Sequence, residues 1–171
     1  GLMIMMYRPF DVRDYVVVDG AEGTVRSVNI ARTKLHTIDN KVVSVPNGKI
    51  WSGVITNNSG NYTRRVDMVF SISYSDDIDL AIRILTELVG ENDKVLKSPE
   101  PVIEVNTLNS SSVDIICRPW VKRDDYFPLF WEMQRRVKIS FDAAGITIPF
   151  PQQQVHFVPG PGRATTDEIT K

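Results

Sequence analysis

Histidine and cysteine side chains, which often carry catalysis or bind transition metals, are few and scattered in this sequence. His36 and His156 each lack a cysteine or a second histidine at the spacing of a metal site. Cys117 is the only cysteine, so an intramolecular disulfide and a cysteine-rich metal site are excluded. It lies in an apolar run, where a cysteine is typical of a small core residue with little thiolate character. We therefore expect no catalytic residue, no metal and no cofactor.

Three aspartates, Asp76, Asp77 and Asp79, crowd together, and clustered carboxylates can bind a cation. The glycine and further ligands of a calcium-binding loop are absent, however, and acidic side chains are favoured where a helix begins. We interpret them as the start of a helix over residues 77–89, with Ser75 or Asp76 as its N-cap. The sequence also lacks a phosphate-binding glycine loop, a nucleophile elbow and a zinc-binding helix motif.

The composition is that of an ordinary globular chain. The sequence has 171 residues, of which 42% are hydrophobic and 24% charged, with a formal net charge of -1. This length suits one domain or two small ones. The net charge argues against a general polyanion binder, because the attraction to phosphate groups would be weak.

Five short β signals follow one another early in the chain, at residues 15–18, 23–30, 34–37, 42–45 and 54–57. We expect turns at Asp19-Gly20, Glu22-Gly23 and Asp39-Asn40. Such closely spaced strands predict a small, strongly bent barrel, whose closure would protect the strand edges.

The fourth of these strands runs into a sharp corner at Pro46, Asn47 and Gly48. Pro46 ends the strand because it has no N–H to donate to a ladder. Asn47-Gly48 suits either a positive φ or the cap of a short helix that leads to Ile50 and Trp51. We expect substitution of Asn47 or Gly48 to distort the β domain.

The pattern then changes to alternating strands and helices. We predict a strand at residues 65–73, the helix at 77–89, a hairpin of residues 102–108 and 113–118, and a helix at about 125–144. A last short strand begins at Ile146. This order is that of a ferredoxin-like split βαβ domain. The stripe that we expect to be buried on the second helix consists of Phe127, Phe130, Trp131, Val137 and Phe141.

The two ends of the chain look incomplete by themselves. After Pro149 and Pro151, residues 153–158 form a lone extended segment, which identical strands from neighbouring chains could complete in a cyclic assembly. Residues 159–171 are interpreted as a disordered tail. At the start, Leu2-Met3-Ile4-Met5-Met6 suggests the end of a longer apolar helix, with a buried first strand or an amphipathic start as alternatives. Arg8-Pro9-Phe10 should end that segment.

Five phrases, in this order, resemble the cytoplasmic part of the mechanosensitive channels of small conductance. Any one of them is weak, but their order and separation are specific, and the resemblance runs from Gly1 to about Val158. The phrases are Arg8-Pro9-Phe10 with Asp14-Tyr15-Val16, Val45-Pro46-Asn47-Gly48-Lys49-Ile50, Ser75-Asp76-Asp77-Ile78-Asp79, Phe141-Asp142-Ala143-Ala144-Gly145-Ile146, and Pro149-Phe150-Pro151-Gln152.

The resemblance implies an α+β fold in successive parts. Residues 1–10 would end a pore-lining transmembrane helix, and 11–60 would form a small Sm-like β-barrel domain. Residues 61–150 would form a ferredoxin-like α/β domain, and 151–158 a strand of a parallel β-barrel between subunits. Pro149, Phe150, Pro151 and Gln152 would be the joint that aims this strand, and Arg8, Pro9 and Phe10 would lie near the membrane surface.

The same resemblance implies a function and partners. It implies a homoheptameric, tension-gated pore of the bacterial inner membrane that releases ions and small solutes on hypo-osmotic shock, with this region on the cytoplasmic side. Side portals between subunits would filter solutes, and upstream helices would contact the lipid bilayer. Arg8 would pair with an acid or a lipid headgroup. At Asp11 the sequence departs from the family pattern, because the best-known member has a basic residue at this position.

A soluble RNA-binding module is the alternative, because small barrels and ferredoxin-like sheets both occur in RNA-binding proteins. The expected central strands at 102–108 and 113–118 contain no Phe, Tyr or Trp for base stacking. Neither strand has the basic and aromatic signature of such a surface. We therefore expect no nucleic-acid partner.

Overall fold

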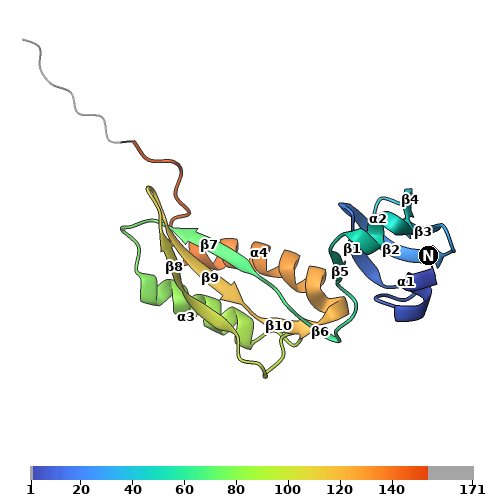
Figure 1. Ribbon diagram of the computed structural model, residues 1–171. Helices are drawn as coiled ribbons and strands as arrows, with labels where there is room; N and C mark the ends of the chain where they lie inside the picture. Colours follow the sequence, from blue (N-terminus) through green and yellow to red (C-terminus); the bar gives the residue numbers. More distant parts are fainter. Residues whose placement is uncertain (1, 154–171) are drawn as a thin grey trace, which may run out of the picture.

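Two separate hydrophobic cores organise residues 2–153, the part of the chain that the computed structural model describes (Figure 1). The smaller core lies in the amino-terminal β domain and the larger one in the α/β domain that follows. The smaller core is made of Ile4, Phe10, Val16, Val18, Val25, Leu35, Val45 and Ile50.

The β domain contains the five predicted strands, which are antiparallel and lie in the order β4-β3-β2-β1-β5. The β-branched residues of these strands alternate between the core and the surface, so that Val16 and Val18 are fully buried in β1. The elements are α1 (Leu2–Tyr7), β1 (Tyr15–Val18), β2 (Ala21–Val28), β3 (Arg32–His36), β4 (Val42–Pro46), α2 (Asn47–Ser52) and β5 (Ile55–Asn57).

Turn chemistry explains the strong bend of this sheet. Asp19 and Gly20 both have positive φ, 48° and 73°, which is the signature of the type I′ turn that suits a two-residue hairpin. The expected turn at Asp39-Asn40 is also present, with Asn40 at φ 63°. The ladder between β2 and β3 has a bulge between Val25 and Ser27, which increases the local twist. Among the described ladders none joins β4 to β5, so backbone hydrogen bonds do not close the sheet into a complete barrel.

The expected turn at Glu22-Gly23 is wrong, because both residues lie within β2. Gly23 is needed there for another reason. A Cβ at this position would lie 2.6 Å from the carbonyl oxygen of His36 on β3. Glycine therefore permits the close approach of the two strands.

The α/β domain has a three-stranded antiparallel sheet, β7-β9-β8, with both long helices on one face. Met68 and Phe70 from β7 and Ile115 and Cys117 from β9 point into this core. The elements are β7 (Met68–Ile72), α3 (Ile78–Gly90), β8 (Val102–Leu108), β9 (Val113–Arg118) and α4 (Tyr126–Ala143). Their order is that of the predicted ferredoxin-like arrangement up to its last strand.

Three local predictions for this domain need correction. The strand expected at 65–73 is interrupted: β6 (Thr63–Arg65) pairs with β10 (Trp120–Lys122) in a separate two-stranded sheet. The N-cap of α3 is Asp77, whose side chain accepts a hydrogen bond from the N–H of Leu80. The segment from Ile146 is not a strand, because it makes a single ladder-like bond, from Ser73 N to Thr147 O, before the prolines remove further donors.

The predicted buried stripe of α4 is only half right. Val137 and Phe141 are buried, but Phe127 and Trp131 are 41% and 65% exposed. Toward the start of α4, the buried stripe continues through Met133 and Leu129, at intervals of four residues. The first turns of α4 lie toward the β domain and beyond the larger sheet, so their aromatic side chains have no sheet to cover them (Figure 1).

Candidate functional site

Helix α1 presents an apolar surface that nothing in residues 2–153 covers. Ile4 is its only buried residue, with 1% of its surface exposed. Leu2, Met5, Met6 and Tyr7 are all more than half exposed, at 73%, 51%, 65% and 63%. A helix that is apolar on its outer side as well as on its docked side is typical of a segment that meets another apolar partner.

The end of α1 is fixed by the Arg8-Pro9-Phe10 phrase, as the sequence predicts. Arg8 adopts the left-handed conformation, φ 44°, and its N–H donates to the carbonyl of Ile4 at 2.9 Å. Pro9 then prevents another helical turn. Phe10 is 4% exposed and joins Ile4 in the smaller core. The helix is therefore anchored to the β domain on both sides of its end.

Arg8 pairs with Asp11 within the same chain. Its Nη2 and Nε lie 2.7 and 3.0 Å from Asp11 Oδ1. Because both side chains are exposed, the pair contributes less than about 1 kcal/mol to folding. Asp11 is held in turn by its own N–H, which donates to Asp14 Oδ2 at 2.9 Å. Asp11, the residue at which the sequence departs from the pattern that it resembles, is therefore the partner of Arg8.

Asn47 joins the corner after β4 to the turn between β2 and β3. Its Oδ1 accepts a hydrogen bond from Thr33 Oγ1 at 2.8 Å, and its Nδ2 donates to the carbonyls of Asn29 and Ile30 at 2.6 and 3.1 Å. Asn47 is 1% exposed, so these bonds satisfy a polar group that water does not reach. Its backbone N–H also donates to Ala31 O at 3.0 Å.

Pro46 and Gly48 have simpler roles than Asn47. A short helix does follow this corner, but its N-cap residue is Pro46, with φ −60° and ψ 132°, and Asn47-Gly48 form its first two residues instead of its cap. Gly48 lies inside the helix without a positive φ, and a Cβ there would meet nothing within 4 Å. The expectation that a substitution of Gly48 distorts the β domain therefore has no support in its surroundings.

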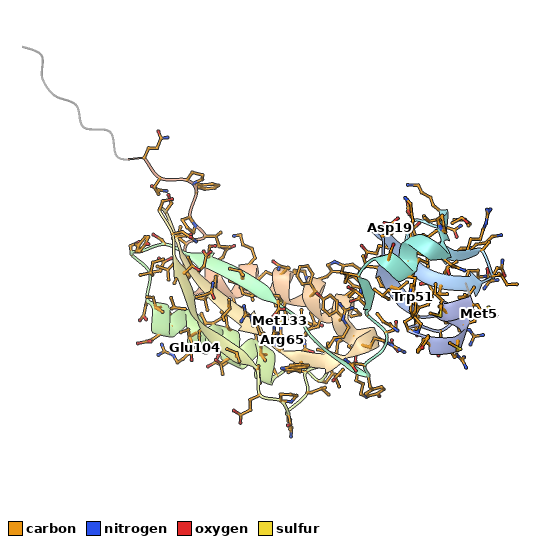
Figure 2. The ribbon with its side chains drawn as sticks, viewed as in Figure 1. Met5, Asp19, Trp51, Arg65, Glu104 and Met133 are labelled. Atoms are coloured by element: carbon orange, nitrogen blue, oxygen red, sulfur yellow. The ribbon has the colours of Figure 1, made fainter. Side chains whose placement is uncertain are left out.

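An aromatic pair connects α1 to α2. The ring centroids of Tyr7 and Trp51 lie 5.6 Å apart at an interplanar angle of 38°. Both rings are partly exposed beside the apolar side of α1, and Figure 2 shows Trp51 and Met5 in the same small domain. Sequence reasoning missed this pair, because the two residues lie far apart in the chain and share no motif.

The predicted joint lies at the other end of the molecule, where the described chain leaves the α/β domain (Figure 1). Gln152 N donates to Ser111 Oγ at 3.2 Å, and Asp76 Oδ2 accepts from Thr147 N at 2.8 Å. Pro149 is half-buried, whereas Phe150 is exposed, and Pro151 follows without regular structure. The predicted strand and tail beyond residue 153 lie outside the described residues. The three groups of predicted site residues thus do not form one site.

The described part of the chain contains one cysteine and one histidine. Burial raises the pKa of the Cys117 thiol to about 12, so little thiolate exists near neutral pH. His36 lies half-buried in β3, and His156 is outside the described residues. Residues 2–153 contain no group of three histidine, cysteine or acidic side chains arranged to bind a metal. Within the same residues, no helix combines the length and the apolar character that crossing a membrane requires.

Two family models match most of the chain. The β domain of mechanosensitive ion channels matches residues 1–60, and the C-terminal domain of the mechanosensitive ion channel MscS matches residues 66–148. The matched ranges follow the two hydrophobic cores.

Similar proteins of known name or structure agree with these models. The small-conductance mechanosensitive channel of Edwardsiella ictaluri is 38% identical over 91% of this chain and 54% of its own length. An MscS family protein of Synechocystis is 37% identical over 92% of this chain and 53% of its own length. The crystal structure of Helicobacter pylori MscS in the closed state matches with a TM-score of 0.86 and 26% identity, over 93% of this chain and 63% of that one. The chain spans about half the length of the curated relatives that it matches.

Proposed function

Because the chain belongs to the small-conductance mechanosensitive channel (MscS) family, we propose that residues 1–10 end a pore-lining helix and that residues 11–158 form the cytoplasmic vestibule part of a tension-gated channel. In this proposal the whole protein releases ions and small solutes on hypo-osmotic shock. It lies in the bacterial inner membrane, with this region on the cytoplasmic side. The family is a class of ion channels, and the proposed activity requires no catalytic residue.

The observation that carries the proposal is the uncovered apolar side of α1. A helix that buries only Ile4 against the β domain, and exposes Leu2 and Met6 by more than half, suits the end of a longer pore-lining helix. Arg8 follows at the point where the apolar segment ends, where basic side chains commonly meet lipid headgroups. Its intramolecular pair with Asp11 is exposed enough to exchange for a headgroup at little cost.

Gating in this proposal is a two-state equilibrium that membrane tension biases toward the open state. The β domain would hold the end of the pore helix through Ile4 and Phe10 while the helix moves. Identical chains, seven in this proposal, would surround the vestibule. Residues 151–158 of each chain would complete a parallel barrel, because a lone strand leaves its backbone groups unsatisfied.

The RNA-binding alternative has no support in the strands or in the relatives of this chain. Strands β8 and β9 contain no aromatic side chain for base stacking, and the matched relatives carry the names of channels or of their family.

Patch-clamp recording tests the proposal directly. The full-length protein, including the upstream helices of this proposal, is expressed in a bacterial strain that lacks its own mechanosensitive channels. Giant spheroplasts from this strain are then stretched by suction. We expect a tension-activated current and improved survival of hypo-osmotic shock. Met5→Asp, which places a charge on the uncovered side of α1, should shift or abolish the activation, whereas Val42→Asp on the exposed edge strand β4 is the matched control. Absence of any tension-activated current from membrane-inserted protein would contradict the proposal.

A further inference from the structure

A cavity of about 480 Å³ lies between the two domains. Figure 1 shows the amino-terminal end of α4 facing the β domain at this place, beside β5 and β6. The volume is within the range of sites that hold small molecules. Both domains and the segment between them contribute to the lining, which consists of Arg13, Tyr15, Thr24, Thr37, Ile38, Asn58, Ser59, Arg64, Arg123, Asp124, Phe127 and Trp131.

The cavity is positively charged although the chain as a whole is not. Three arginines line it against one acid, Asp124, so the lining carries a formal charge of three minus one, or +2, against -1 for the entire chain. Glu22 accepts the hydroxyl hydrogen of Tyr15, but it does not line the cavity. Concentrated guanidinium groups favour phosphate and carboxylate ligands.

Arg64 is held in position by a neighbouring ring, but the N–H groups of its guanidinium remain available to a ligand. Its guanidinium carbon lies 4.0 Å from the centroid of the Tyr126 ring, a cation–π contact that engages the flat face of the group. The side chain is half-buried, yet within residues 2–153 it makes no hydrogen bond and no salt bridge. A half-buried guanidinium with five unpartnered N–H donors is suited to a ligand with several acceptor oxygens.

Arg13 and Arg123 are also fixed by their backbones and neighbours. Arg13 has φ 83°, a left-handed conformation that glycine favours, and its N–H donates to Val25 O at 2.8 Å. Its side chain has no salt-bridge partner among the described residues. Arg123 donates to Ser59 O at 3.1 Å and to Asp124 at 3.0 Å. Arg13 is exposed, so its guanidinium can reach a ligand in the cavity that it lines.

A flat aromatic surface borders the charged part of the cavity. The rings of Phe127 and Trp131 stack with centroids 5.5 Å apart at 26°, and Tyr126 packs edge-on against Phe127 at 5.1 Å. Trp131, at 65% exposure, keeps one side of its ring open to solvent or to a ligand. Exposed aromatic rings beside arginines are the arrangement with which proteins stack a nucleobase and hold its phosphates.

We propose that this cavity is a binding site for a nucleoside phosphate. The base stacks on Trp131, and Arg13, Arg64 and Arg123 hold the phosphate groups. Because the lining comes from both domains, the bound ligand connects them. The proposal stands on the cavity alone and does not depend on the channel activity.

Binding is tested with the full chain in detergent, by calorimetry and by tryptophan fluorescence at low ionic strength. The three probes are ADP, adenosine, which has the base without charge, and pyrophosphate, which has the charge without a base. We expect ADP to bind roughly tenfold or more tightly than either fragment and to quench Trp131. Pyrophosphate that binds as tightly as ADP would overturn the assignment of a base, and absence of ADP binding at millimolar concentration would overturn the site.

Variants separate binding from folding. Trp131→Leu should weaken ADP binding about 5- to 100-fold and Trp131→Phe much less, because phenylalanine keeps a stacking face. Arg64→Gln should weaken it similarly, with Arg83→Gln, an exposed arginine of α3 outside the cavity, as the control. Arg13→Gly should raise the melting temperature while it weakens ADP binding, a combination that a merely structural role would not give. Unchanged affinity in Trp131→Leu and Arg64→Gln would overturn the proposal.

Discussion

Asn47 and Thr33 hydrogen-bond to each other through their side chains, Oγ1 to Oδ1 at 2.8 Å, in the interior of the β domain. Thr33 is fully buried and Asn47 almost so. The two residues belong to different segments, β3 and the first turn of α2, and the Asn47 amide reaches on to two carbonyls between β2 and β3. A single side chain therefore determines how the corner after β4 sits on the sheet.

Asn47→Ala should destabilise the β domain by about 1–3 kcal/mol, because it leaves the Thr33 hydroxyl and two carbonyls without partners. Urea unfolding followed by circular dichroism measures the loss. Asn61→Ala, at an exposed asparagine for which the described structure shows no side-chain hydrogen bond, should change the unfolding midpoint little. Equal midpoints for the two variants would contradict the role of Asn47.

A double-mutant cycle with Thr33→Val isolates the bond itself. Valine has the shape of threonine without its hydroxyl, so the double variant removes both partners together. We expect a coupling energy of about 0.5–3 kcal/mol between the two positions. Strictly additive losses would show that Asn47 acts only through the carbonyls of Asn29 and Ile30.

Two glycines of the β domain should respond in opposite directions. Gly23→Ala should cost about 1–3 kcal/mol, because its Cβ would lie 2.6 Å from the backbone oxygen of His36 and would push β3 away. Gly48→Ala should stabilise the protein by about 0.5–1 kcal/mol, since the site is helical and open. Thermal unfolding of the two variants and the parent measures both. A stabilised Gly23→Ala variant would refute the close approach of β2 and β3.

The strands of the β domain could be predicted because their signals are local. Short runs rich in β-branched or apolar residues, together with the Asp19-Gly20 and Asp39-Asn40 turns, indicated all five. Gly23 was misread because a glycine that permits close approach of strands resembles a glycine in a turn. The sequence pointed to Asn47, but its partners Thr33, Asn29 and Ile30 come from another segment and left no signal near it.

The orientation of α4 could not be predicted from periodicity alone. Phe127 and Trp131 are four residues apart, as are Leu129 and Met133, so either pair could begin the buried stripe. The choice depends on how far the sheet extends beneath the helix, which is a property of the whole fold. The cavity between the domains could not be predicted from the sequence either, because the three arginines that line it come from three distant parts of the chain.

The ion pair between Glu132 and Lys94 should make stability depend on pH. Glu132 Oε2 lies 3.0 Å from Lys94 Nζ and links α4 to the loop after α3. The hydrogen bond from Lys94 lowers the pKa of Glu132, with help from Asn92, and the hydrogen bond to Glu132 raises the pKa of Lys94. Stability from the glutamate is present above its unfolded pKa of about 4.3 and is lost as the pH falls through its lower folded pKa.

The contribution of Lys94 to stability depends on pH in the opposite direction. Its contribution is present below its unfolded pKa of about 10.4 and is lost as the pH rises through its higher folded pKa. The pair should therefore stabilise the protein between about pH 5 and 10 and fail at both ends. Urea midpoints measured from about pH 7 down to about pH 3 should decline less in Glu132→Gln, whereas Glu87→Gln, at an exposed glutamate of α3, should follow the parent. Identical acid profiles for Glu132→Gln and the parent would exclude the pair as the cause.

Trp51 should lie at the level of the lipid headgroups in the assembled protein. Its ring packs on Tyr7 at 5.6 Å beside the uncovered side of α1, and tryptophan and tyrosine favour the membrane–water interface. In the full chain reconstituted in lipid, Trp120→Phe combined with Trp131→Phe leaves Trp51 as the only tryptophan of these 171 residues. Lipids with brominated acyl chains should quench its fluorescence. A variant that keeps only Trp120, which lies in the α/β domain, should not be quenched. Equal quenching of both variants, or of neither, would show that α1 does not place the β domain against the bilayer.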